Sequence, residues 1–486
     1  MVPRHVSVLI VGAGFSGIGA AIRLTKSGRT DYLIIERADD LGGTWRDNTY
    51  PGVACDVQSQ LYSFSFALSA QWPRIYPGQR EIQEYLRRTA ERFGILGRMV
   101  FGCALTSARW DNTRRLWRIT TTRGVYTAKV LVTAFGGLSE PREPDISGME
   151  QFEGEVFHTA RWNHGVDLEG KRVAVIGTGA SAVQLIPRIA QRAAHLDVFQ
   201  RTPPWIMPRA DRAYSPREQF AFRHIPGWQR LLRAAMYCRR ELNTAAFCYA
   251  PRILQLVSQQ STRHLFRQIA DPGLRAQLTP NDVMGCKRVL LSDDYYPTFN
   301  RENVSLVTDR IARIRPGGVV TDQDRLHAVD VIVLATGFRA TDSPAADLIT
   351  GADGRTLGSL WRAAGQQAYK GTSVAGFPNL FTLIGPNTGV GTTSMIFMIE
   401  SQLNYLIDAL RAMDRHSLAA VEVRGQVQDR FNSSLQRRMT RTVWATGCSS
   451  WYLDANGRNT TIWPNFGFVF RAITRHFDLH AYRTYA

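Results

Sequence analysis

A glycine-rich turn near the start of the chain has the spacing that lets a backbone approach a phosphate group. Gly12, Gly14 and Gly17 directly follow the apolar run 6–11. Glycines at these places allow a tight turn, leave room for a pyrophosphate and let a helix lie close to a strand. The next apolar run ends in Glu36, where a carboxylate suits the free hydroxyls of a ribose. The segment is therefore predicted to bind a dinucleotide of the FAD type.

The same pattern returns later in the chain, and it differs where the ribose would lie. Its small residues are Gly177, Gly179 and Ser181, after the apolar run 173–176. The following apolar run leads to Arg201 and Thr202. Because a guanidinium can form paired hydrogen bonds with a phosphate, this end favours the ribose 2′-phosphate of NADPH over NADH. A chain that binds both FAD and NADPH could pass a hydride from the nicotinamide to the flavin.

Strands and helices must hold both turns in place, and apolar runs supply them in alternation. The runs 128–133 and 329–334 are typical of buried strands, and the second leads into a small-residue turn with Thr336 and Gly337. Such a turn lets the chain approach a cofactor closely. Alternating strands and helices indicate parallel, doubly wound sheets. We therefore predict an α/β fold with two Rossmann-like dinucleotide-binding domains, one for FAD and one for NADPH.

Changes in composition indicate where the domains begin and end. A linker rich in proline and charge, 139–145, follows the first domain, and a basic, aromatic stretch with helical spacing interrupts the second. The predicted parts are the FAD-binding domain, first part, 1–145; the NADPH-binding domain, first part, 146–215; a helical insertion, 216–282; the NADPH-binding domain, second part, 283–340; and the FAD-binding domain, second part, with a C-terminal pocket region, 341–486.

Composition excludes several classes of protein. The formal net charge is +18, but the basic residues are almost all scattered arginines, which argues against a nucleic-acid-binding surface. No apolar run reaches the roughly 20 residues of a membrane span, and the first strand begins too early for a signal peptide. The cysteines have neither Cys-x-x-Cys nor metal-type spacing, which excludes a dithiol reductase and predicts no metal site. We expect a cytoplasmic protein.

Two further segments carry a resemblance to a known family. Residues 43–56 contain a Gly-x-Trp…Tyr-Pro-Gly…Asp pattern that ends in Asp56. Residues 152–163 contain a Phe-x-Gly-x-x-x-His-x-x-x-Trp pattern formed by Phe152, Gly154, His158 and Trp162. Both resemble signatures of the type I Baeyer–Villiger monooxygenases, which belong to the class B flavoprotein monooxygenases. The resemblance covers nearly the whole chain, and Phe135 and Asn163 depart from the usual residues of the family.

The resemblance implies an enzyme that uses NADPH, FAD and O2 to convert a ketone into an ester or a lactone. In the family, the reduced flavin adds O2 at carbon 4a, and the adduct attacks the ketone carbonyl. By resemblance, Arg288 lies over the flavin and supplies a fixed positive charge, while Asp56 holds Arg288 in place. These two are the predicted catalytic residues. Lys287 resembles the lysine that holds the ribose phosphate, although a Lys-Arg pair is otherwise typical of a solvated surface.

Other residues are predicted to bind the flavin or to order the junction between the domains. Thr44, Trp45 and Tyr62 are expected near the flavin, although Trp45 and Tyr62 could also be core residues. His158 could serve as a general base, but its place just beyond the linker favours a role in ordering the junction between the domains during their movement. Trp162 is expected to pack in that junction.

The substrate pocket is expected to be roomy and apolar, which suits an aryl, alicyclic or longer-chain ketone. Its lining would come from the insertion and from aromatic residues near the C-terminus, which are Trp444, Trp451, Tyr452 and Trp463. The alternative enzyme is a flavin monooxygenase that oxygenates sulfides or amines.

A hypothesis from another class of function is that the chain is a flavin-bound protein that interacts with a partner or lies on a membrane surface. Its support is the basic, aromatic stretch 228–240 of the insertion, in which Leu231, Leu232, Ala235 and Met236 lie near one helical face. Burial of that face against the rest of the fold is the competing expectation.

Overall fold

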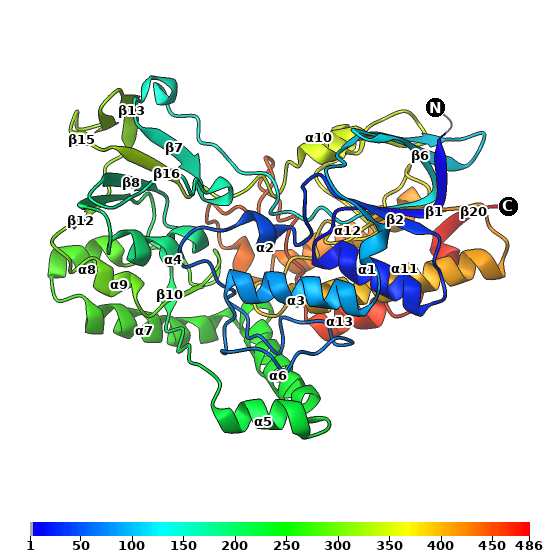
Figure 1. The fold of residues 1–486 in the computed structure, drawn as a ribbon, viewed down its shortest axis with the longest axis horizontal. Helices are drawn as coiled ribbons and strands as arrows, with labels where there is room; N and C mark the ends of the chain where they lie inside the picture. Colours follow the sequence, from blue (N-terminus) through cyan, green and yellow to red (C-terminus); the bar gives the residue numbers. More distant parts are fainter. Residues whose placement is uncertain (1–2) are drawn as a thin grey trace.

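The computed structural model describes residues 3–486, which form two lobes that are each built around a sheet (Figure 1). The lobe on the right of Figure 1 contains β1 (Arg4–Val11) and the first glycine turn. The lobe on the left contains β8 (Arg172–Ile176) and the second glycine turn. The predicted α/β fold with two Rossmann-like sheets is confirmed. The domain boundaries given above stay predictions.

The first sheet has eight strands in the order β17-β4-β5-β6-β1-β2-β3, with β18 paired to β6. The central strands β2, β1, β6 and β18 are parallel, whereas β4, β5 and β6 pair antiparallel. The other strands are β2 (Tyr32–Ile35), β3 (Met99–Val100), β4 (Leu105–Asp111), β5 (Leu116–Thr121), β6 (Gly124–Thr133), β17 (Ile349–Thr350) and β18 (Leu380–Thr382). The chain therefore returns to the first sheet after it has built the second.

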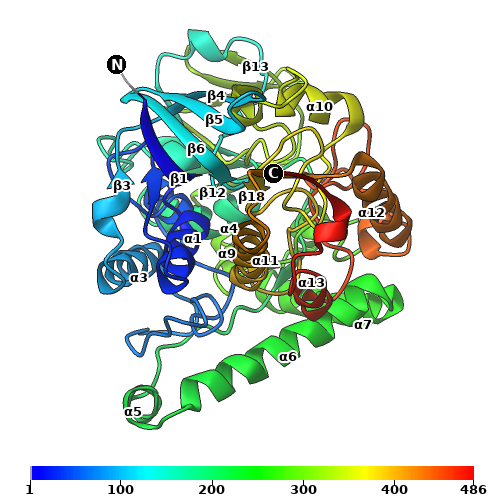
Figure 2. The same ribbon diagram turned by 90° about the vertical axis from the view of Figure 1, so that its right-hand side faces the viewer.

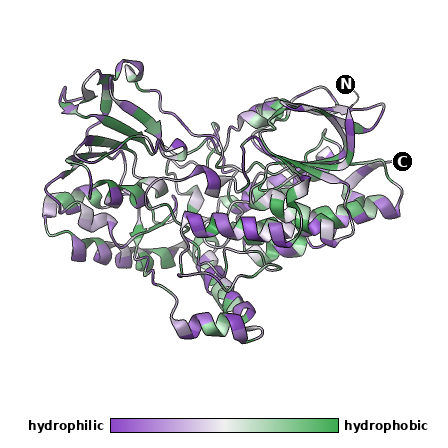
Figure 3. Cartoon of the chain, viewed as in Figure 1, coloured by the Kyte–Doolittle hydropathy of each residue, from purple (hydrophilic) through white to green (hydrophobic). Residues whose placement is uncertain are grey.

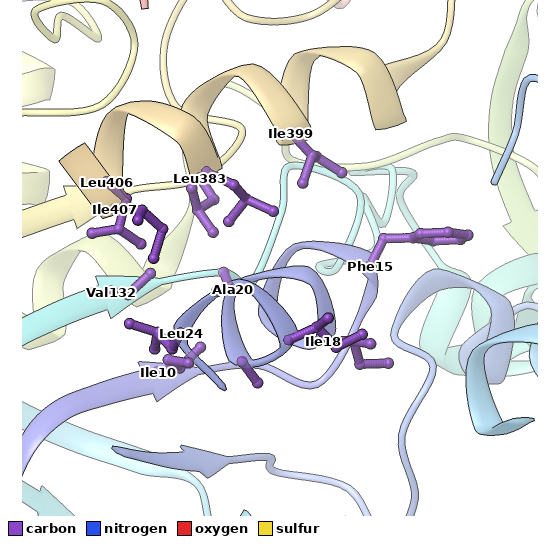
Figure 4. Close-up of a cluster of buried hydrophobic side chains, with 14 of the residues drawn as sticks. Ile10, Phe15, Ile18, Ala20, Leu24, Val132, Leu383, Ile399, Leu406 and Ile407 are labelled. Atoms are coloured by element: carbon purple, nitrogen blue, oxygen red, sulfur yellow. The ribbon is translucent and has the colours of Figure 1, made fainter. Parts of the chain in front are cut away.

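Helices from both ends of the chain cover one face of this sheet (Figure 2). They are α1 (Phe15–Lys26), α3 (Gln79–Arg92) and α11 (Met395–Arg415). Between them, Ile10 and Val132 of the strands meet Ile18 of α1 and Leu406 of α11, all with at most 1% of their surface exposed (Figure 4). Burial of each such side chain contributes about 2 kcal/mol, so this core fixes the position of α1 against the sheet.

Six further elements complete the first lobe. They are α2 (Thr44–Asp47), α10 (Leu357–Ala364), β19 (Ala420–Val423), α12 (Gly425–Met439), α13 (Gly467–Ile473) and β20 (Tyr482–Tyr485).

The second sheet has five parallel strands in the order β12-β9-β8-β16-β7. Its other strands are β7 (Glu155–His158), β9 (His195–Phe199), β12 (Val304–Val307) and β16 (Val331–Leu334). The helices α4 (Ala180–Ile189) and α9 (Tyr295–Thr298) belong to this lobe, as does an antiparallel group, β13 (Ile311–Arg315), β14 (Gly318–Thr321) and β15 (Leu326–Ala328). A parallel pair, β10 (Ile206–Met207) and β11 (Leu290–Leu291), lies on either side of the insertion in the sequence.

The insertion is helical, as predicted, and contains α5 (Pro216–His224), α6 (Trp228–Cys248), α7 (Pro251–Gln268) and α8 (Pro272–Leu278). A capping box starts α5, because Ser215 accepts from the backbone N–H of Glu218 while the Glu218 carboxylate accepts from that of Ser215. The face expected on α6 is divided in the structure. Leu232 and Met236 pack against the core of the first lobe, whereas Leu231 and Ala235 are exposed.

Candidate active site

The first glycine turn lies between β1 and α1 and is shaped for close approach. At Gly12, φ is +109°, and a Cβ would lie 2.8 Å from the carbonyl oxygen of Ala134. A Cβ at Gly17 would lie 1.9 Å from the carbonyl oxygen of Gly12, so only glycine fits there. At Gly14 the nearest atom would be the Cα of Gly43, at 3.7 Å. No side chain caps the start of α1, which leaves its backbone N–H groups free for a pyrophosphate such as that of FAD.

Glu36 follows β2 and turns its carboxylate back toward this turn. The carboxylate accepts from the backbone N–H of Ala13 at 2.8 Å and of Ala38 at 3.1 Å, and it pairs with Arg46 at 3.0 Å. A cavity of about 330 Å³ has Ala38 and Arg46 in its lining, together with Arg37. An acidic side chain beside the glycine turn fits the ribose hydroxyls of FAD.

The second glycine turn repeats the first in its geometry. At Gly177, φ is again +109°, and a Cβ would lie 2.6 Å from the carbonyl oxygen of Ala335. At Gly179 no atom lies within 4 Å of the place of a Cβ, and no side chain caps α4, which starts at the next residue. Ser181, in the first turn of α4, is half-buried. This second cradle fits the pyrophosphate of NADPH.

The basic end of the second turn gathers residues that are distant in sequence. The Nζ of Lys287 donates to the Oγ1 of Thr202 at 3.2 Å and pairs with Asp282 at 2.7 Å. Arg201 is exposed and forms no ion pair within residues 3–486. Lys287, Thr202 and Arg201 can therefore face one phosphate, which fits the 2′-phosphate of NADPH.

The linker between the domains runs beside the turn that contains Thr336 and Gly337. Thr336 donates its hydroxyl to the carbonyl oxygen of Arg142, and the N–H of Arg142 donates to the carbonyl oxygen of Gly337 at 2.9 Å. His158, the last residue of β7, lies opposite Leu334 of β16. These contacts bring His158 and the turn 335–337 together at the junction of the two lobes.

The remaining residues of the Phe-x-Gly-x-x-x-His-x-x-x-Trp pattern pack within the second lobe. A Cβ at Gly154 would lie 2.3 Å from the carbonyl oxygen of Asp330, which explains the glycine. Phe152 packs against the core of the second lobe, and Trp162 meets Phe157 edge-on with ring centroids 4.9 Å apart. Burial lowers the pKa of His158, whose Nδ1 accepts from the backbone N–H of Ala160 at 3.0 Å. The role of His158 in ordering the junction stays a prediction.

Arg288 and Asp56 form an ion pair between segments that are far apart in the chain. Two guanidinium nitrogens of Arg288 donate to the Oδ2 of Asp56, at 3.0 Å from Nε and at 2.5 Å from the terminal nitrogen. Each side chain keeps 29% of its surface exposed, so the pair can still meet a bound molecule. The charge of Asp56 raises the pKa of Arg288 in spite of burial. Burial alone would raise the pKa of Asp56, but Arg288 and Arg240 outweigh it and lower that pKa.

Two residues beside this pair extend the site. Arg240 of α6 donates to the backbone carbonyl of Asp56 at 3.1 Å, and its charge is the second one that acts on that carboxylate. Tyr452 is 1% exposed, and burial raises the pKa of its hydroxyl while the charge of Arg288 lowers it. The sequence pattern predicted Tyr452 as a pocket residue but gave Arg240 no role. Helical spacing alone does not separate Arg240 from the other arginines of the insertion.

The residues expected near the flavin lie in the first lobe. The indole N–H of Trp45 donates to the Tyr62 hydroxyl at 3.1 Å, and the rings meet edge-on at 5.6 Å. Tyr62 also packs edge-on against Phe15, the first residue of α1, at 5.2 Å. Thr44 is exposed at the start of α2. Trp45 and Tyr62 thus belong to the core of the first lobe. Burial raises the pKa of Tyr62, and the charge of Asp56 adds a smaller increase.

A disulfide joins Cys286, which directly precedes Lys287 and Arg288, to Cys448 near the C-terminus. The two Cα atoms are 6.2 Å apart, within the range of ordinary disulfides, and 162 residues separate them in sequence. Cysteine spacing in the sequence gave no sign of this pairing. The link holds the segment that contains Trp451 and Tyr452 against the basic residues of the site.

Within residues 3–486, no cluster of three or more His, Cys, Asp or Glu side chains could hold a metal ion. In the same part of the chain, no helix combines the length and the apolarity that crossing a bilayer requires.

Comparison with known proteins agrees with the geometry of the site. Residues 9–225 match the family model described as pyridine nucleotide-disulphide oxidoreductase. A Baeyer–Villiger monooxygenase of Pseudomonas aeruginosa is 47% identical over 482 residues, which cover 99% of this chain and 91% of the relative. A crystal structure of OTEMO in complex with FAD and NADP has 29% identity and a TM-score of 0.88, over 96% of this chain and 97% of that one.

A further solved structure is a cyclohexanone monooxygenase bound to ε-caprolactone, with 28% identity and a TM-score of 0.84 over 99% of this chain and all of that one. Two dinucleotide cradles together with a half-buried guanidinium define a flavoprotein oxidoreductase. Within that class, the chain belongs to the Baeyer–Villiger monooxygenases, which confirms the family predicted from the sequence.

Proposed function

We propose that this chain binds FAD in the first cradle and NADPH in the second, and that it uses O2 to convert a ketone into an ester or a lactone. The observation that carries the proposal is the ion pair between Asp56 and Arg288. It supports the proposal because it joins Asp56, in the first part of the chain, to Arg288, whose neighbour Lys287 contacts Thr202 of the second lobe.

The cofactors are held by residues of both lobes. The turn at Gly12 and the start of α1 bind the FAD pyrophosphate, and Glu36 binds its ribose. The turn at Gly177 binds the NADPH pyrophosphate, while Arg201, Thr202 and Lys287 hold the 2′-phosphate. When bound, the two cofactors supply the hydride transfer and the activation of O2.

Arg288 has the properties that oxygen transfer to a carbonyl requires. Its pKa is raised by Asp56, so it stays protonated at any physiological pH and cannot donate a proton to an oxygen anion. It can therefore stabilise negative charge without quenching it. Asp56, whose pKa is lowered, stays ionised through the mildly acidic and neutral range and fixes the guanidinium in place. Both members of the ion pair therefore stay charged in the folded protein at mildly acidic and neutral pH.

We propose that an apolar ketone binds beside Arg288. Trp444, Tyr452 and Trp463 are each at most 5% exposed, and Tyr452 lies beside Arg288. Trp444 and Tyr452 pack in one apolar cluster and Trp463 in another, and a site bordered by such residues would hold a ring or a long chain by shape and apolar contact. The relative bound to ε-caprolactone shows that a cyclic ester fits a site of the same fold.

The proposal is tested by replacing Arg288 and by measuring NADPH consumption, ester and hydrogen peroxide for a panel of ketones. Arg288→Ala should still oxidise NADPH but should form ester about a hundredfold more slowly, since a charge that stabilises the reacting oxygen is lost. The missing ester should appear as hydrogen peroxide. Arg288→Lys, which keeps the positive charge, should form ester at a rate between that of the parent protein and that of Arg288→Ala.

The control is Arg310→Ala, which removes an exposed arginine from the second lobe. Sulfides run in parallel separate oxygen transfer to a carbonyl from transfer to sulfur. Undiminished ester formation by Arg288→Ala would remove the arginine from the mechanism, and turnover of sulfides without any ester would contradict the ketone as substrate.

A further inference from the structure

The helical insertion exposes an unusual number of large apolar side chains. Of the 14 that residues 3–486 expose, seven lie on α5, α6 and α7, and two more, Ile225 and Tyr249, directly follow α5 and α6. They include Phe220, Trp228, Leu231, Leu242, Ile253 and Leu256, and the exposed fractions of Leu231, Leu256 and Leu242 reach 62%, 67% and 74%. A large patch of exposed apolar residues usually marks a surface that contacts another protein or a membrane.

On α6 these residues follow one face of the helix. Trp228, Leu231, Ala235, Cys238 and Leu242 are all exposed and are spaced by three or four residues. That spacing places them in a single stripe along the helix. Within the described residues, the stripe is thus a largely uncovered face, of which Trp228 is the most covered large apolar residue at 39% exposure.

The opposite face of α6 is firmly attached. Arg233 donates to the backbone carbonyls of Gln60, Leu61 and Ser63 at 2.8–3.0 Å, and Leu232 packs against the core of the first lobe. The bare stripe is therefore the outer side of a fixed helix. Figures 1 and 2 both show α5, α6 and α7 along the lower edge of the molecule.

The surroundings of the stripe are strongly basic. Arg217, Arg223, Arg230, Arg239 and Arg252 are exposed and form no ion pair within the described residues. Of the nearby acids, Glu218 is paired with Arg212, and Glu241 is buried and accepts from the backbone N–H of Gly467. Figure 3 shows hydrophilic and hydrophobic residues alternating along α5 and α6.

We propose that α5, α6 and the first turns of α7 form a docking face for an anionic lipid surface, on which the protein lies without crossing it. Aromatic and aliphatic side chains beside unpaired arginines have the composition of helices that lie in the membrane interface. Anionic headgroups complement the arginines, and each arginine adds to the attraction. A second copy of this chain would instead bring arginines against arginines, which opposes self-association through this face.

The docking face is one helix away from the candidate active site. Arg240, on the inner side of α6, reaches the backbone of Asp56 at 3.1 Å. A ketone that partitions into lipid would therefore be concentrated close to the insertion that lines the pocket. The proposal does not depend on the reaction, and its test uses binding.

The test is flotation of the FAD-loaded protein with vesicles of phosphatidylcholine alone and of phosphatidylcholine mixed with phosphatidylglycerol. The protein should float with the mixed vesicles at low salt and much less at high salt. The triple variant Arg223→Gln, Arg230→Gln, Arg239→Gln should bind about a hundredfold more weakly. The double variant Leu231→Glu, Leu242→Glu should not float.

Leu326→Glu is the matched control, because Leu326 is 50% exposed on β15 of the second lobe and lies outside the face. All variants should retain FAD and oxidise NADPH in solution at the unaltered rate, which shows that they are folded. Equal flotation with both kinds of vesicle, or none with either, would overturn the proposal. A dimer in light scattering that the double variant abolishes, without any vesicle binding, would assign the face to a second copy instead.

Discussion

At the scale of single residues, the site depends on charges that are placed by sequence-distant partners. Lys287 lies between Thr202 and Asp282, and Arg288 is held by Asp56. Neighbouring residues thus have different partners: Lys287 contacts Thr202 of the second lobe, and Arg288 contacts Asp56 of the first part of the chain. This division explains why an adjacent Lys-Arg pair is not a solvated surface here.

Arg201 provides a direct test of which nucleotide is bound. It is exposed and has no ion-pair partner within the described residues, so its guanidinium is free to bind a 2′-phosphate. Arg201→Ala should raise the KM for NADPH by about tenfold or more, since a charged hydrogen bond contributes about 1.5–3 kcal/mol. The KM for NADH, which lacks that phosphate, should change little. Steady-state kinetics with both nucleotides measures this, and equal effects would remove the assignment.

Sequence reasoning succeeded for residues whose chemistry is local. Glu36 ends a strand-like run next to a glycine turn, and the structure places its carboxylate on the backbone of Ala13. It failed for Arg240, whose partner Asp56 is 184 residues away. Nothing in the spacing of an arginine-rich helix shows which arginine points inward, because that is decided by packing against another part of the chain.

At the scale of elements, the turn between β1 and α1 contains one glycine that the fold requires and another that cofactor binding requires. Gly17 is required by the fold itself, since a Cβ would lie 1.9 Å from the carbonyl oxygen of Gly12. Gly14 has free space around it, with the nearest atom at 3.7 Å. The two glycines of one motif therefore have different tasks.

Gly17→Ala should unfold at a clearly lower temperature than the parent even without FAD, because the backbone must shift and strain of this kind costs about 1–3 kcal/mol. Gly14→Ala should keep the apoprotein's melting temperature but lose FAD on dialysis, since its Cβ would occupy the approach to the pyrophosphate. Thermal melts of apoprotein and the flavin content after dialysis distinguish the two. A Gly14→Ala variant that retains FAD normally would contradict the proposed cradle.

The elements themselves were predictable where both ends carry local signals. The helix that starts at Phe15 and ends at Lys26 follows a glycine turn and stops before Gly28, and β2 is a short apolar run, Tyr32–Ile35. The outer face of α6 was not predictable in the same way. Leu231 and Leu232 are neighbours in sequence, yet one is 62% exposed and the other packs on the core, because the helix crosses an edge of the fold.

At the scale of the whole molecule, a covalent link ties the C-terminal region to the site. The disulfide between Cys286 and Cys448 closes a loop of the chain that contains parts of both lobes, among them β12, β16, β18 and α11. It can limit how far the segment of Tyr452 moves from Arg288 during a catalytic cycle. Four other cysteines are free, of which Cys238 is exposed and the rest are buried.

Reduction of this disulfide should loosen the basic side of the site. With a reductant such as dithiothreitol, the KM for NADPH should rise several-fold and the ratio of ester to NADPH consumed should fall. Without reductant, Cys448→Ser should already show the raised KM and the lowered ratio of ester to NADPH, and adding reductant should not change them further. The control Cys238→Ser should respond to reductant as the parent protein does. Mass spectrometry of the untreated protein should find Cys286 and Cys448 linked, and free thiols at both would contradict the expectation.

The return of the chain to its first sheet has a consequence for synthesis. As the polypeptide leaves the ribosome, β6 is made long before β18, and α1 long before α11, so the first lobe cannot close until nearly the whole message is translated. All strands of the second sheet lie between Glu155 and Leu334, and that lobe can be completed earlier. Nascent chains arrested before residue 380 should therefore expose an open β6 edge and be prone to aggregation.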